Sequence, residues 1–103
     1  MFAWIFFRAA PIPRSRWSVV PSPNPFPNVN DSLVAIAAVN AKDIWAFDFS
    51  SLGPFTEHWN GTSWSVVKTP SGVVAINGAA ALSDGTVVAV GVGTNNRGVI
   101  LQN

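Results

Sequence analysis

The chain has 103 residues, of which 49% are hydrophobic and 11% are charged, and its net charge is +1. This length accommodates one small domain, and the nearly neutral charge offers no electrostatic basis for binding nucleic acid or an acidic lipid surface. The sequence contains no cysteine, which excludes a disulfide framework and a thiolate metal site.

Residues 1–16 form a segment that is not part of any repeat, and seven apolar residues precede its first basic residue, Arg8. A secretory signal carries its basic region before the apolar stretch, and a membrane span takes about 20 apolar residues. We therefore expect no membrane span. We interpret the segment as a ragged terminus or as a start codon inside a longer gene, and a remnant export signal is the alternative.

A proline run follows, in which four prolines alternate with other residues from Pro21 to Pro27. Proline lacks the amide donor that a helix or a central strand requires. The run is therefore expected to be an extended connector of the polyproline type. A ligand for SH3 or WW domains is the functional alternative.

The next part of the chain predicts four short strands with turn residues between them. Their expected bounds are 33–39, 43–49, 55–60 and 63–69. The second strand alternates, so that Trp45, Phe47 and Phe49 share one face, and Ile44, Ala46 and Asp48 share the other. The pair Asn60-Gly61 favours a tight hairpin. Trp59 and Trp64 flank this turn and are expected to pair across it.

The remaining residues predict three further strands, at 73–82, 86–93 and 98–103. Asp84-Gly85 supplies the turn between the first two, and Asn77-Gly78 interrupts the first. A helix is the rival interpretation of the alanine-rich segments, but their branched residues and short lengths favour strands. Strand 86–93 alternates, with Val88, Val90 and Val92 at the positions where the first unit has Trp45, Phe47 and Phe49.

Parts of the sequence occur twice. Residues 17–22 (WSVVPS) return as residues 64–69 (WSVVKT), and residues 36–47 return more weakly as residues 79–90. A period of about 40–50 residues is typical of propeller blades. The second unit has no counterpart of the last strand of the first unit, residues 63–69. Residues 17–20 match that strand in sequence, so we expect them to complete the second unit.

The predicted fold is therefore all-β, with two four-stranded antiparallel blades of a β-propeller. One blade comprises residues 33–69, and the other comprises residues 73–103 together with the strand 17–20. Propellers have about 4–8 blades, so two blades cannot close a ring. The propeller is expected to be partial or to be completed by oligomerisation.

Three segments resemble tandem repeats of bacterial β-propeller proteins: residues 17–24 (WSVVPSPN), 40–46 (NAKDIWA) and 57–67 (EHWNGTSWSVV). The resemblance covers residues 17–103 and extends more distantly to kelch-like and Asp-box repeats. It implies a propeller fold and an exported or cell-surface bacterial setting.

The sequence departs from this repeat pattern at several positions. Asp48 stands where the pattern has glycine, and Val88 replaces a tryptophan. Residues 60–64 lack the aspartate of an Asp box, which argues against a sialidase-type function.

Two residues are candidate ligand contacts. His58 is the only histidine. A metal site usually needs three or four ligands, so a lone histidine does not indicate one. The alternative to a ligand contact is a half-exposed strand residue with a structural role. Asp48 lies on an apolar strand, where a buried carboxylate would need a partner. Lys42, Arg97 or amides that line the propeller ring are the candidates. Asp31, Asp43 and Asp84 lie at turns, where aspartate commonly bonds the local backbone.

The sequence assigns no catalytic residue, cofactor or metal. Its tryptophans are expected mainly to pack between blades, with carbohydrate binding as the alternative. The leading hypothesis is a non-enzymatic binding or scaffold module that associates with itself or with further blades and binds a carbohydrate or protein ligand. The alternatives are a fragment of a propeller enzyme, such as a glycoside hydrolase or lyase, and a truncated gene product without its own function.

Overall fold

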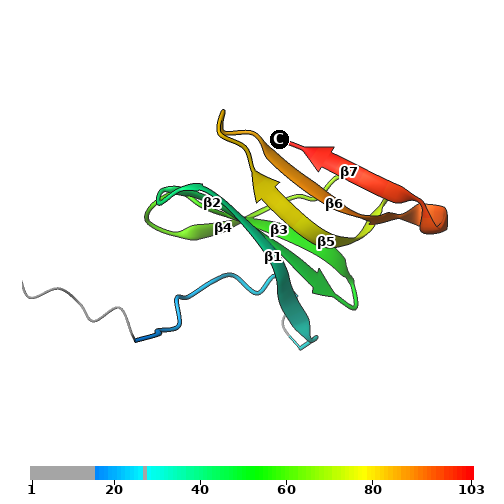
Figure 1. Cartoon of the computed structure of the whole chain (residues 1–103). Coiled ribbons are helices and arrows are strands. Elements are labelled where there is room, and N and C mark those ends of the chain that lie inside the picture. The colour runs from blue at the N-terminus through cyan, green and yellow to red at the C-terminus, as the bar shows by residue number, and fades with distance from the viewer. Residues whose placement is uncertain (1–15, 27) are drawn as a thin grey trace, which may run out of the picture.

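The computed structural model describes residues 16–26 and 28–103 and consists of two antiparallel β-sheets (Figure 1). The N-terminal non-repeat segment 1–16, apart from Arg16, and Pro27 of the proline run lie outside the described residues. The elements in chain order are β1 (Asp31–Asn40), β2 (Asp43–Ser50), β3 (Gly53–Trp59), β4 (Trp64–Val67), β5 (Val73–Ala81), β6 (Val87–Gly93), the 3-10 turn η1 (Thr94–Asn96) and β7 (Gly98–Gln102). The all-β fold predicted from the sequence is confirmed.

Sheet A has the order β1-β2-β3-β4, and sheet B has the order β5-β6-β7. All neighbouring strands are antiparallel and consecutive in the chain, as short turns between strands require. Within the described residues, no helix is long and apolar enough to cross a membrane.

The turn between β3 and β4 forms as its residues predict. Gly61 adopts φ +100°, and the Asn60 side-chain oxygen accepts hydrogen bonds from the amides of Thr62 and Ser63. Trp59 and Trp64 pair across the turn, with ring centroids 5.7 Å apart. The predicted cross-strand tryptophan pair is therefore present.

The second sheet differs from the prediction, because it has three strands and residues 17–20 form none. Trp17 is 98% exposed. The following segment is attached to sheet A instead, where the Phe26 ring meets the Phe55 ring edge-on at a centroid distance of 5.7 Å. This contact lies on the face of sheet A that points away from sheet B, so residues 17–20 are not led to the free edge of β7.

The core lies between the two sheets. It consists of the buried residues Ala37, Phe47, Ile76, Val87 and Ala89, with Trp45 and Leu101 packed against them. The alternation predicted for β2 is observed: Trp45 and Phe47 face sheet B, while Ala46 and Asp48 are buried on the opposite face. Removing apolar surface from water at this interface, at about 25 cal/mol per Å², holds the sheets together.

The hairpin β5–β6 has the same pairing as the hairpin β1–β2, displaced by 43 residues. Leu33 pairs with Asp48 and Ala35 with Phe47, so that Val34 is skipped. Ile76 pairs with Gly91 and Gly78 with Val90, so that Asn77 is skipped. Both first strands thus carry a β-bulge at the same place, and Gly91 occupies the position that Asp48 occupies in sheet A.

Candidate functional site

The outer face of sheet A, which points away from sheet B, contains two buried acidic side chains. Asp48 of β2 is 2% exposed and Glu57 of β3 is 1% exposed. Ala46 pairs with Glu57 and Asp48 pairs with Phe55, so the two carboxyls are diagonal neighbours on one face. The sequence analysis selected Asp48 but not Glu57. The alternation of β3 could have indicated Glu57, because residues 55 and 57 of a strand share a face and Phe55 is a residue expected to be buried.

The electrostatics of this pair favour a retained proton. Burial raises the pKa of Asp48 to about 8, and the hydrogen bond and charge of Glu57, followed by the charge of Asp31, add to this effect. At neutral pH Asp48 is therefore protonated beside Glu57. The oxygens Asp48 Oδ1 and Glu57 Oε1 are buried and have no hydrogen-bond partner among the described residues. The partner of Asp48 is another acid, so the expected pairing with Lys42 or Arg97 is wrong.

Residues 20–26, which we call the strap, cover this outer face. Phe26 contacts Phe55, the residue paired with Asp48. At the other end, the strap residues Val20 to Pro23 line a hollow of about 430 Å³ together with Trp59 and Trp64. When the side-chain amide of Asn24 is oriented with its nitrogen toward Asp31, that nitrogen donates a hydrogen bond to Asp31 Oδ2 at 2.7 Å. These contacts place the strap along the face of sheet A that holds the two buried carboxyls.

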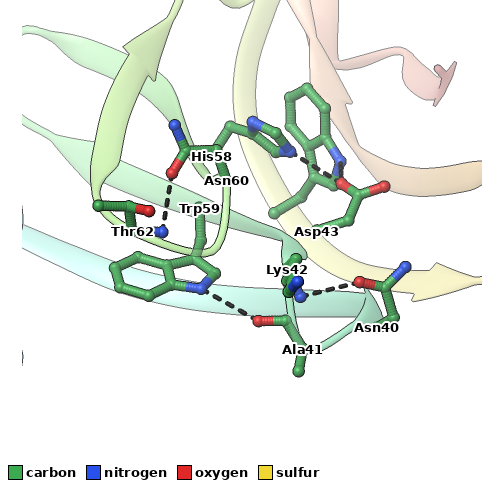
Figure 2. Close-up of polar contacts among 9 residues, drawn as sticks. Asn40, Ala41, Lys42, Asp43, His58, Trp59, Asn60 and Thr62 are labelled. Carbon is green, nitrogen blue, oxygen red and sulfur yellow. Dashed lines mark hydrogen bonds and ion pairs between the residues drawn. The ribbon is translucent and has the colours of Figure 1, made fainter.

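His58 lies on the opposite face of β3, as alternation requires. Its Nε2 is 2.8 Å from Asp43 Oδ1, and the Trp45 Nε1 donates to the same oxygen at 3.1 Å. The rings of Trp45 and His58 are in contact at a centroid distance of 4.3 Å, with their planes tilted by 37°. Figure 2 shows this cluster beside the Asn40–Asp43 turn. Asp43 thus holds two side chains, which differs from the local backbone role expected for it.

The two sequence-predicted contacts, Asp48 and His58, are therefore not brought together, because they lie on opposite faces of sheet A. The expected turn role is observed at Asp84, whose Oδ1 accepts the Thr86 amide at 2.9 Å; this bond lowers the pKa of the exposed carboxyl. Across the described residues, no three His, Cys, Asp or Glu side chains are grouped as a metal site would require.

A second hollow, of about 230 Å³, lies between the sheets near the end of β7. Trp45, Phe47 and Leu101 supply apolar walls, and Thr56 and Lys68 supply polar groups at its margin. The Thr56 and Thr69 hydroxyls share a hydrogen bond of 3.0 Å there. This hollow continues the inter-sheet core and offers mainly apolar contact.

Comparison with protein-family models, with curated proteins and with solved structures finds no significant match to this chain.

Proposed function

We propose that this chain is a non-enzymatic binding or scaffold module of the β-propeller type, which associates with copies of itself or with further blades. The observation that carries the proposal is the outer face of sheet B. Its apolar side chains, Val74, Val90, Val92 and Ile100, are all exposed, and Ile100 is exposed to 75%. Contiguous apolar surface of this kind is characteristic of an interaction site.

The internal repeat supports a sheet as the occupant of this valine face. Val88, Val90 and Val92 take the sequence positions of Trp45, Phe47 and Phe49 one repeat earlier. In sheet A that face is the one that packs on the neighbouring sheet, with Phe47 in the core. By the same logic, the valine face of sheet B is suited to another apolar sheet face rather than to a small polar ligand.

The enzyme-fragment alternative finds less support. Asp48 and Glu57 are neighbouring acids on one face, yet both are almost completely buried. A glycosidase needs two carboxyls that flank a bound sugar. The bacterial and exported setting rests on the resemblance of residues 17–103 to tandem propeller repeats, and a carbohydrate or protein ligand is part of the same proposal.

The mass of the purified chain in solution tests this proposal, measured by light scattering behind a sizing column. We expect a defined oligomer, because the valine face is removed from water only in an assembly. Val90→Lys places a charge in that face and is expected to give a monomer. Leu52→Lys is the matched control, since Leu52 is also exposed but lies in the β2–β3 turn. A wild-type chain that is a well-behaved monomer at all concentrations would contradict the proposal.

A further inference from the structure

We propose that the strap, residues 20–26, is a pH-sensitive cover of the outer face of sheet A: it stays closed while Asp48 keeps its proton beside Glu57 and opens when Asp48 is ionised. The proposal concerns a face different from the valine face of sheet B. It therefore does not depend on self-association.

The contacts that close the strap are few. Two are apolar: the edge-on contact of Phe26 with Phe55, and the hollow shared by Val20 to Pro23 with Trp59 and Trp64. The third is the hydrogen bond that the Asn24 side-chain nitrogen donates to Asp31 Oδ2. The prolines lack amide donors, and among the described residues no backbone hydrogen bond joins the strap to a strand of sheet A. Such a segment opens locally far more easily than a paired strand.

The groups beneath the strap make ionisation costly. Asp31 of β1 and Glu57 of β3 are the titratable groups that face Asp48. The remaining neighbours, β4 (Trp64–Val67) and the strap itself, contain no charged residue. Asp48 thus lies near two other acids, and Asp48 Oδ1 and Glu57 Oε1 already lack a partner. Once Asp48 loses its proton, its negative charge is buried beside acidic neighbours.

Water reaches these carboxylates most directly when the strap lifts, because the opposite side of sheet A is packed against sheet B. Opening the strap solvates both charges and sacrifices only the few contacts described above. Burial and Glu57 raise the pKa of Asp48 to about 8 while the strap is closed, and opening releases this proton, so the transition is expected at or below about pH 8. At acidic pH Asp48 keeps its proton and the strap stays closed.

The absence of cysteine from the sequence allows a single label to report on the strap. Ser22 lines the hollow with Trp59 and Trp64, so a bimane dye on Ser22→Cys is expected to be quenched by these rings while the strap is closed. The full chain is titrated from about pH 4 to pH 10, and far-UV circular dichroism is recorded in parallel. We expect dye emission to rise with a midpoint at or below about pH 8 while the β-sheet signal stays constant.

Two variants in the labelled chain decide between the proposal and its alternatives. Asp48→Asn keeps the shape of the pair but cannot release the proton, so it should remove the transition. Asp43→Asn changes an acid on the opposite face and should leave it in place. If Asp48→Asn does not fold, Glu57→Gln serves instead, because it also removes the second charge and should abolish the transition or move it by more than one pH unit.

Three results would overturn the proposal: a wild-type chain that remains quenched up to pH 10, an Asp48→Asn chain that keeps the transition, or loss of β-sheet signal together with the rise in emission. Repeating the titration at two protein concentrations separates strap opening from dissociation. A midpoint that is independent of concentration supports the strap, whereas one that moves with concentration assigns the change to self-association and refutes the local cover.

Discussion

Replacing Gly91 with alanine is expected to destabilise the fold strongly. A Cβ atom on Gly91 would lie 1.9 Å from the carbonyl oxygen of Ala75 and 2.9 Å from the Cα of Ile76. Both are backbone atoms of β5 beside its bulge, so a change of rotamer cannot relieve the clash and the paired strands must separate. Overpacking typically costs about 1–3 kcal/mol. We expect about 3 kcal/mol here, because the β5–β6 hydrogen bonds are strained as well.

Gly98→Ala is the matched control in the same sheet, since a Cβ there meets no atom within 4 Å. It should change the free energy of unfolding by less than about 0.5 kcal/mol. Urea unfolding followed by far-UV circular dichroism measures both variants. In a thermal scan, a loss of about 3 kcal/mol lowers Tm by roughly 12–24 °C for a chain of this size. Equal midpoints for the two variants would refute the close approach of β5 to β6.

Two further predictions concern sheet A. The raised pKa of Asp48 means that the folded chain holds a proton that the unfolded chain releases above about pH 4. The contribution of this proton to the free energy of unfolding is complete below that pH. It is lost as the pH rises to about 8. The unfolding free energy of Asp48→Asn should therefore exceed that of the wild type by an amount that grows by up to about 1.4 kcal/mol per pH unit in this window, and parallel pH profiles in urea unfolding would contradict this. Asn60→Ala removes the acceptor of two backbone amides and should cost about 1 kcal/mol in the same assay; an unchanged midpoint would mean that the turn forms without this side chain.

Local chemistry explains why the strands could be predicted. The expected strand 43–49 is observed as Asp43–Ser50, because alternating aromatic and small residues fit a strand buried on both faces. The turn at Asn60-Gly61 follows from the tolerance of glycine for positive φ and from the side-chain acceptor of Asn60. In each case the information lies within a few consecutive residues.

The candidate site was only half predictable, because it depends on contacts between distant residues. Asp48 was conspicuous on an apolar strand, but its neighbour Glu57 follows from the β2–β3 register, which the sequence does not state. The proline run was expected to be extended, yet nothing in its composition specifies the contact of Phe26 with Phe55. The same contact explains why residues 17–20 do not join the second sheet as predicted.

The two outward faces of the sheet pair differ in chemistry, and this difference constrains how copies can associate. The valine face of sheet B is open and apolar, whereas the outer face of sheet A carries the two buried acids beneath the strap. A head-to-tail contact would place one valine face on the acidic face of the next copy. It would have to displace the strap and bury the acids under apolar side chains. A two-fold contact between two valine faces would require neither change, but it cannot continue the head-to-tail stacking of sheet A on sheet B. Propeller-type association through the acidic face of sheet A would therefore require the strap to be displaced.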